Sequence, residues 1–184
     1  MYCGMASKML GLKGKLPLAQ FKPALGINPD ILARYNANRL QVVRQVHYSQ
    51  HNENSIDFVL FLNGLPVATV ELKTDFTQSI GDAIDQHRFA VSNREVHMTT
   101  RLDGPATQFL PFNQGDHGAA GNPLNPHGGH RTAYLWEQVW ERQSWLEILG
   151  RYLVAQKDDK KQIKTIIFPR FHQLDATRKL QGLE

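Results

Sequence analysis

The chain lacks the features that mark secreted and membrane proteins. Cys3 is the only cysteine among 184 residues, which rules out an internal disulfide and suits a reducing cytoplasm. No apolar run approaches the roughly eighteen residues that are needed to cross a bilayer. The first residues include lysines but no apolar signal region, so a secretory signal is not expected. These absences predict a cytoplasmic protein without a membrane segment.

The composition is that of a globular domain, but the charge is unevenly spread. Hydrophobic residues make up 41% and charged residues 21% of the chain, whose formal net charge is +4. Residues 1–50 carry seven lysines and arginines and one acidic residue, Asp30. A basic front part suits a polyanionic partner, although a solvated basic surface explains the same pattern equally well.

Apolar patterning predicts strands before it predicts helices. The clearest element is a central hairpin in which residues 56–62 and 66–73 flank the turn Asn63-Gly64. Alternating residues at 39–49 predict a further strand. Weaker patterns predict helices near 29–37 and 79–87, strands at 89–91, 96–100 and 109–112, and a long Gly- and Pro-rich loop at 116–129.

From Thr132 the apolar spacing becomes helical. The segment Ser144–Glu147 matches a capping box, which predicts two consecutive helices with a break near Gln143. A charged linker is expected at 157–164, an extended piece at 165–168 and a last helix at 171–181. The order of elements predicts an α/β fold: a mixed central sheet flanked by helices, with a C-terminal helical segment.

The chemistry is concentrated in the pattern D-x13-E-x-K, formed by Asp57, Glu71 and Lys73. Glu71 and Lys73 are two apart on a strand and therefore share a face. Two carboxylates from adjacent strands, with the carbonyl of Leu72, are hard oxygen ligands that suit Mg²⁺. Such a cation polarises a phosphate and acidifies water, while Lys73 offsets developing negative charge. A structural ion pair is the alternative interpretation.

Strand register provides a test of this hypothesis. A plain two-residue Asn63-Gly64 turn pairs Asp57 with Val70 and sends Asp57 to the face opposite Glu71. A shared site requires Asp57 across from Glu71. The hypothesis therefore predicts a three- or five-residue loop, or a β-bulge, in this hairpin.

Several segments resemble the nuclease region of type I restriction endonuclease R subunits, which belong to the PD-(D/E)xK superfamily. They include IDFVLFLNGLPVATVELK, FLPFNQG, GAAGNPLNP and FPRFHQLDATRKL, and the likeness runs from about Asn36 to Leu180. The resemblance implies a restriction-endonuclease-like fold with an endonuclease domain at 1–155. It implies that residues 156–184 are a linker and the start of an ATP-driven motor.

The resemblance also implies roles for individual residues. Asp57 and Glu71 become Mg²⁺ ligands, Lys73 the catalytic lysine, and Gln86 the glutamine of a Q-x-x-x-Y motif. Arg170 and Gln173 occupy positions associated with adenine contact. We expect Arg39 and Arg44 in the basic front part to contact DNA.

The function implied is Mg²⁺-dependent hydrolysis of duplex DNA, with sequence choice left to partner specificity (S) and methylation (M) subunits. Two departures matter. No G-x-x-x-x-G-K-[ST] loop is present, so ATP enters only through a motor that this sequence lacks. The residue four after Gln86 is Ala90, not tyrosine, and relatives have a further segment here. The alternative is therefore a catalytically inactive remnant that acts as a DNA-binding or complex-docking module.

Other candidates carry less chemistry. The histidines at 117, 127 and 130 fit no standard zinc spacing and suit a surface loop better. Trp136, Trp140 and Trp145 have helical spacing, which favours core or interface over base stacking. Asp30 is the only acid before Glu53 and is a loose candidate for an upstream acid on a helix.

Overall fold

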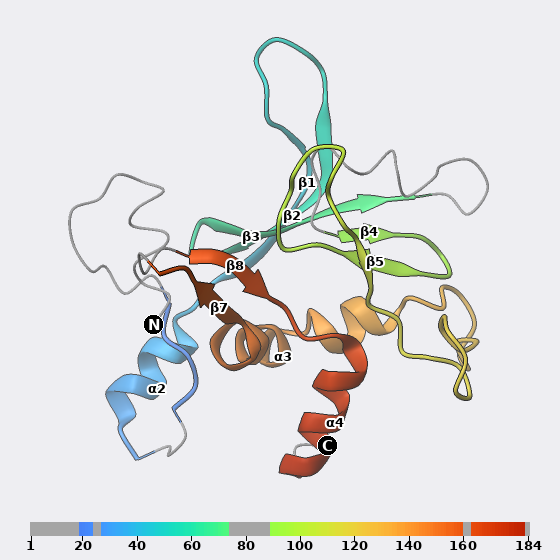
Figure 1. Cartoon of the computed structure of the whole chain (residues 1–184). Helices are drawn as coiled ribbons and strands as arrows, with labels where there is room; N and C mark the ends of the chain where they lie inside the picture. Colours follow the sequence, from blue (N-terminus) through green and yellow to red (C-terminus); the bar gives the residue numbers. More distant parts are fainter. Residues whose placement is uncertain (1–18, 24–26, 74–88, 160–162, 183–184) are drawn as a thin grey trace.

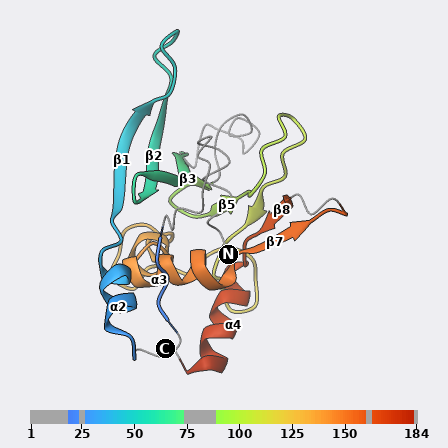
Figure 2. The same cartoon turned by 90° about the vertical axis from the view of Figure 1, so that its left-hand side faces the viewer.

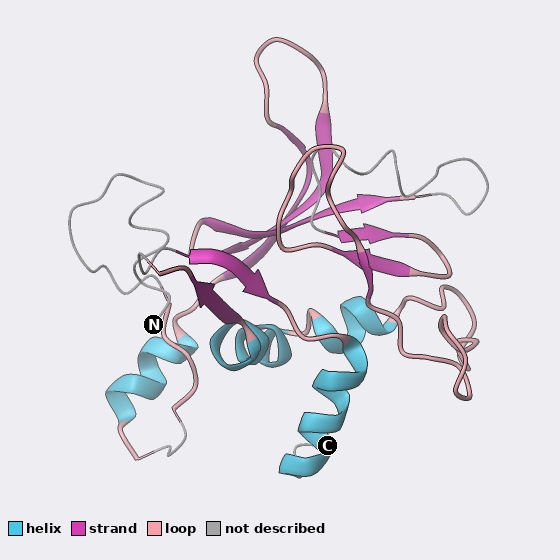
Figure 3. Cartoon of the chain, viewed as in Figure 1, coloured by secondary structure: helices cyan, strands magenta, loops and turns pink. Residues whose placement is uncertain are grey.

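The fold is a mixed α/β arrangement in which described helices lie on one side of a six-stranded sheet (Figures 1 and 3). The computed structural model describes residues 19–23, 27–73, 89–159 and 163–182. The sheet has the order β1-β2-β3-β4-β5-β6, and only the β3–β4 pair is parallel. Its strands are β1 (Leu40–His47), β2 (Ser55–Leu62), β3 (Leu65–Leu72), β4 (Phe89–Val91), β5 (Val96–Met98) and β6 (Leu110–Pro111).

The helical part packs under this sheet, as the view turned by 90° also shows (Figure 2). Two π-helical turns flank a short α-helix between residues 135 and 152, with a bend at Trp140 and Glu141 that separates the first turn from the α-helix. A separate two-stranded ribbon and a C-terminal helix follow. These elements are α2 (Pro29–Asn36), η2 (Leu135–Val139), α3 (Arg142–Glu147), η3 (Ile148–Tyr152), β7 (Val154–Lys157), β8 (Ile163–Ile167) and α4 (Phe171–Gln181).

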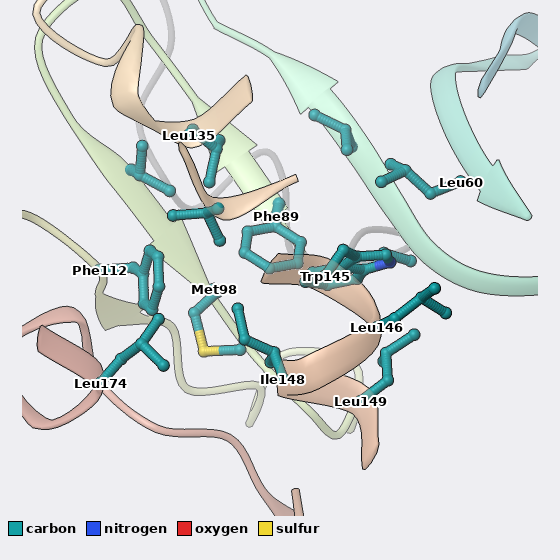
Figure 4. Close-up of a cluster of buried hydrophobic side chains, with 14 of the residues drawn as sticks. Leu60, Phe89, Met98, Phe112, Leu135, Trp145, Leu146, Ile148, Leu149 and Leu174 are labelled. Carbon is teal, nitrogen blue, oxygen red and sulfur yellow. The ribbon is translucent and has the colours of Figure 1, made fainter. Parts of the chain in front are cut away.

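The core lies between the sheet and the η2–α3–η3 stretch (Figure 4). Phe89 is at its centre, with its ring in edge contact with four others at centroid distances of 5.6–6.4 Å. Such pairs add to the stabilisation that burial provides. The buried residues include Leu60, Leu62, Val70, Met98, Phe112, Leu135, Trp145, Leu146 and Ile148.

Most predicted elements are confirmed. The helix near 29–37, the strand at 39–49, the Asn63-Gly64 hairpin and the last helix all appear within a few residues of their expected bounds. The short strands expected at 89–91, 96–100 and 109–112 appear as β4, β5 and β6. The helix predicted at 79–87 lies outside the described residues.

The capping box expected at Ser144 is wrong. Helix α3 begins earlier, at Arg142, and its N-cap is Glu141, whose carboxylate accepts the backbone N–H groups of Gln143 and Ser144 at 2.8 and 3.0 Å. A carboxylate at this position also complements the helix dipole. The Ser144 hydroxyl instead donates to the Val139 carbonyl at 3.2 Å. Its side chain therefore belongs to the first turn of the helix and not to its cap.

The charged linker expected at 157–164 is also partly wrong. Val154–Lys157 and Ile163–Ile167 pair as the antiparallel ribbon β7–β8. The apolar spacing of Leu149 and Leu153 continues the helical pattern in sequence. However, the backbone at Leu153 is already extended, with φ −78° and ψ 122°. The helix therefore ends before Leu153, and the residues after it form a strand.

Candidate functional site

A β-bulge in the β2–β3 hairpin places Asp57 and Glu71 on one face of the sheet. Leu62 pairs with Leu65 across the turn, but beyond the bulge Leu60 pairs with Ala68, so Val67 is the extra residue on β3. The last pair in the ladder joins Phe58 to Val70. One step further, Asp57 comes opposite Glu71. The prediction of a non-default hairpin is confirmed: the turn has two residues, and the bulge changes the register.

The turn itself follows from its two residues. Asn63 and Gly64 have φ values of 52° and 84°, as a type I′ turn requires. The Asn63 side chain accepts the Arg39 N–H at 2.7 Å and donates to the Asn38 side chain at 2.9 Å. These contacts hold the turn against the residues that precede β1, and the extra residue that changes the register lies further along, on β3.

The carboxylate face is the face away from the hydrophobic core. Phe58, Leu60 and Val70 belong to the core cluster, and side chains alternate along a strand. Asp57 and Glu71 therefore point to the other side of the sheet. Both are only partly buried. A ligand at the exposed part of these side chains would leave the packing beneath the sheet undisturbed, although the Glu71 Oε2 atom is itself buried.

The backbone ladder between β2 and β3 ends at the Phe58–Val70 pair. Beyond it, the Asp57 side chain supplies the hydrogen-bond acceptor in place of a backbone carbonyl. Asp57 Oδ2 accepts the Leu72 N–H at 2.8 Å. The next amide, that of Lys73, donates to the Val91 carbonyl on β4 at 2.7 Å. Since successive peptide groups of a strand point to opposite sides, the Leu72 carbonyl faces the same way as its N–H, towards β2. A backbone oxygen therefore lies on the Asp57 side of β3.

Lys73 is held beside Glu71. Its Nζ lies 3.5 Å from Glu71 Oε1, and the side chains of Lys73 and Glu71 are 10% and 22% exposed. Among Asp57, Glu71 and Lys73, the lysine offsets one of the two carboxylate charges. A net negative charge therefore remains next to the Leu72 carbonyl. That balance favours a cation.

The donor set fits the Mg²⁺ expected from the sequence. The ligands are two carboxylates and a backbone carbonyl, all hard oxygen atoms, and Mg²⁺ normally completes such a set with water and phosphate oxygens. Asp57 has about four lone-pair positions, and two of them accept the hydrogen bonds from Leu72 and Gln45. About two lone-pair positions of the Asp57 carboxylate therefore remain for a cation. The described residues contain no group of three or more His, Cys, Asp or Glu side chains arranged to hold a metal.

Three polar residues near this face were missed in the sequence. Gln45 donates to Asp57 Oδ1 at 3.2 Å and accepts from the Ser55 hydroxyl at 3.0 Å. His97 lies in the same row of side chains as Glu71, separated by Ala90. Burial lowers the pKa of the His97 imidazole, an effect that Glu95 partly offsets. Only strand register could have identified these residues, because they come from three different strands, β1, β2 and β5.

The residues expected to contact DNA are exposed but lie elsewhere. Arg44 pairs with Phe58 and stacks over its ring at 5.9 Å, on the face opposite Asp57. Arg39 lies beside Asn63, and Asn63 is six residues from Asp57 along the chain. At the rise of a β-strand, six residues span about 20 Å. The structure therefore does not bring either arginine to the carboxylates. Gln86 lies outside the described residues.

The two residues expected near adenine begin helix α4. Gln173 uses its side-chain oxygen to accept the Arg170 N–H at 2.9 Å. Arg170 is exposed at the N-cap position. The side-chain oxygen of Gln173 therefore caps the N-terminus of helix α4 in this structure.

The three tryptophans divide between core and surface. Trp145 is 1% exposed and Trp140 packs against the core, as expected. Trp136 is 43% exposed and lines an apolar groove of about 740 Å³ together with Val42 and Leu72. Most residues that line this groove lie on the core side of the sheet, and Lys73 lines it as well. The histidines at 117, 127 and 130 are exposed loop residues.

Comparison with known proteins gives one match. Residues 31–114 match the family model described as type I restriction enzyme R protein N terminus. Neither the curated proteins nor the solved structures yield a match. In the part of the chain that is described, no helix is both long and apolar enough to span a membrane.

Proposed function

Because residues 31–114 indicate the N-terminal region of a type I restriction enzyme R protein, we propose that the chain is a Mg²⁺-dependent endonuclease domain acting on duplex DNA. The fold proposed is the restriction-endonuclease-like fold of the PD-(D/E)xK superfamily. The endonuclease domain spans residues 1–155, and residues 156–184 are a linker and the start of a motor domain. The observation that carries the proposal is the bulge at Val67, which brings Asp57 to the face of Glu71.

The residues have distinct roles in this proposal. Asp57, Glu71 and the Leu72 carbonyl hold the cation, which when bound supplies Lewis-acid polarisation of the scissile phosphate and acidifies water. Lys73 stabilises the negative charge that develops on the phosphate oxygens as a water oxygen attacks phosphorus. The bond from phosphorus to the leaving deoxyribose oxygen then breaks, and that oxygen takes a proton. No covalent enzyme intermediate is required.

The partners follow from the family. Duplex DNA is the substrate, the specificity and methylation subunits choose the sequence, and ATP acts through the motor domain. Arg39 and Arg44 contribute to DNA binding at a distance from the scissile phosphate, and Gln86 supports the site. Arg170 and Gln173 contribute to nucleotide contact when a motor is attached. A restriction system of this kind operates in the cytoplasm.

A second candidate is an inactive remnant that only binds DNA or docks into the complex. The observation that favours it is Ala90, which stands where the family motif has tyrosine. Ala90 lies in β4 next to Glu71 and is 4% exposed. The helix-borne positioning group that the motif provides is therefore absent at this position. Metal binding without cleavage is the signature of this candidate.

The test combines metal binding with cleavage. Mn²⁺ titration followed by electron paramagnetic resonance should show one bound ion, with affinity reduced at least about tenfold in Glu71→Ala. The matched control is Glu95→Ala, an exposed carboxylate in the turn between β4 and β5. Plasmid nicking with Mg²⁺ should be slow and independent of ATP. If wild-type protein binds no Mn²⁺, the nuclease proposal is wrong, and if it binds Mn²⁺ without nicking, the inactive remnant is correct.

A further inference from the structure

We propose that Gln45 is a positioning residue for Asp57, whose carboxylate it orients for a divalent cation shared with Glu71. The inference rests on the proposed nuclease function and adds to it a residue outside the D-x13-E-x-K pattern. Gln45 acts through Asp57 and contacts neither cation nor phosphate. Its side chain links Asp57 to Ser55, near the start of β2.

The strand register directs Gln45 at Asp57. The neighbours of Gln45 on β1 pair with Phe58 and Ile56, so Gln45 comes directly opposite Asp57. Its Nε2 donates to Asp57 Oδ1 at 3.2 Å, and its Oε1 accepts from Ser55 Oγ at 3.0 Å. The orientation of the amide follows from chemistry, because an ionised carboxylate only accepts hydrogen bonds and must face the NH₂ group.

The backbone at Gln45 is unusual for a strand. Its φ is +49°, in the left-handed region, whereas the other non-glycine residues with positive φ in the described chain, Asn63 and His117, lie in a turn and a loop. A residue with a long polar side chain rarely has a left-handed backbone conformation inside a strand. Strained residues of this kind persist where surrounding contacts impose them, and they cluster at ligand sites. The contacts here are those to Asp57 and Ser55.

Two neutral donors hold the two oxygens of Asp57. Gln45 holds Oδ1 and the Leu72 N–H holds Oδ2, so the carboxylate plane is fixed from both sides. Neither donor carries a charge, so the carboxylate keeps its full attraction for a cation. Glu71, by contrast, lies beside the Lys73 ammonium group. A carboxylate that is already oriented loses less conformational entropy when the cation binds.

The decisive experiment is a double-mutant cycle with Mn²⁺ as the probe. Gln45→Asn keeps an amide and tolerates the left-handed backbone, but its shorter side chain does not span Asp57 and Ser55. We expect about three- to tenfold weaker Mn²⁺ binding, the effect of losing an exposed supporting hydrogen bond. Ser55→Ala should weaken binding by a smaller factor in the wild-type background. It should have no effect in the Gln45→Asn background, because Ser55 acts only through Gln45.

A second readout does not depend on metal. The amide resonance of Leu72 reports the Asp57 carboxylate that it contacts, and it should shift in Gln45→Asn and in Ser55→Ala. A general structural role would spread shifts over the whole hairpin and lower the melting temperature. Wild-type Mn²⁺ affinity in both variants, with affinity lost in Glu71→Ala, would overturn the role of Gln45 alone. Absence of Mn²⁺ binding in wild-type protein would overturn this inference together with the nuclease proposal.

Discussion

Asp57 lies one step beyond the Phe58–Val70 pair and shares the outer face of the sheet with Glu71. A single extra residue on β3 produces this relationship. Without the bulge, the same two-residue turn would leave the carboxylates on opposite faces, one of them against the core. Burial of an unpaired carboxylate against apolar side chains is costly. Placement of the two carboxylates and packing of the hairpin therefore depend on the same irregularity.

Lys73 should be needed for cleavage and not for metal binding. Its ammonium group lies 3.5 Å from Glu71, so Lys73→Ala removes a positive charge near the cation and should leave Mn²⁺ affinity unchanged or higher. Loss of its charge stabilisation should slow plasmid nicking by about a hundredfold or more. Lys157→Ala, at an exposed position on β7, is the control. Equal loss of metal binding and nicking in Lys73→Ala would show that the lysine supports the site only structurally.

DNA binding should be sensitive to salt and independent of sequence. Each phosphate contact releases counterions, so affinity for a duplex should fall about tenfold or more between low and physiological salt. Arg39→Ala and Arg44→Ala should each lower the slope of log affinity against log salt by about one. Fluorescence anisotropy with two unrelated duplexes measures both quantities. Arg101→Ala, whose guanidinium group pairs with Asp103, serves as the control, and a sharp preference for one duplex would contradict the prediction.

Arg142 should contribute strongly to stability. Its guanidinium group donates to the carbonyls of Tyr35, Asn36 and Asn38 at 3.1–3.3 Å and stacks over the Tyr35 ring. Lysine cannot reproduce this planar contact, so Arg142→Lys should lower the free energy of unfolding by about 1–3 kcal/mol.

The matched control for Arg142→Lys is Arg151→Lys. Arg151 is exposed and makes an i,i+4 ion pair with Glu147 at 3.6 Å. Such surface pairs contribute about 0.5 kcal/mol or less. Urea denaturation of both variants measures the difference. Similar losses in the two variants would mean that the contact between Arg142 and the end of α2 contributes little.

His97 should make the protein less stable in mild acid. Burial lowers the pKa of the folded-state imidazole, so the unfolded chain takes up a proton at a pH where the folded chain does not. Stability is therefore retained above the unfolded pKa, about 6.5, and lost as the pH falls below it. His97→Gln should reduce the loss of stability between pH 7.5 and 5.5. Thermal melts across this range test the prediction, and an unchanged pH dependence would refute it.

Local patterns were sufficient for most of the elements. Asn63-Gly64 between two apolar runs predicts the hairpin because few other residue pairs adopt positive φ twice in succession. The helix at 171–181 was found with its observed bounds. Local patterns failed where two interpretations fit the same residues. Ser144 resembles an N-cap, but Glu141 accepts the free N–H groups first, and Leu153 continues a helical spacing although the chain has already become extended.

The sequence by itself determined the candidate chemistry: two carboxylates and a lysine around a hairpin, with Glu71 and Lys73 on one face by strand periodicity. Only the tertiary structure decided that Asp57 joins them. The bulge at Val67 is a property of the whole hairpin, because burial of Leu60, Ala68 and Val70 on one face selects the register. Gln45 meets Asp57 for a similar reason. The two residues are twelve positions apart across a loop, so pairing between β1 and β2 sets their contact, and no short motif records it.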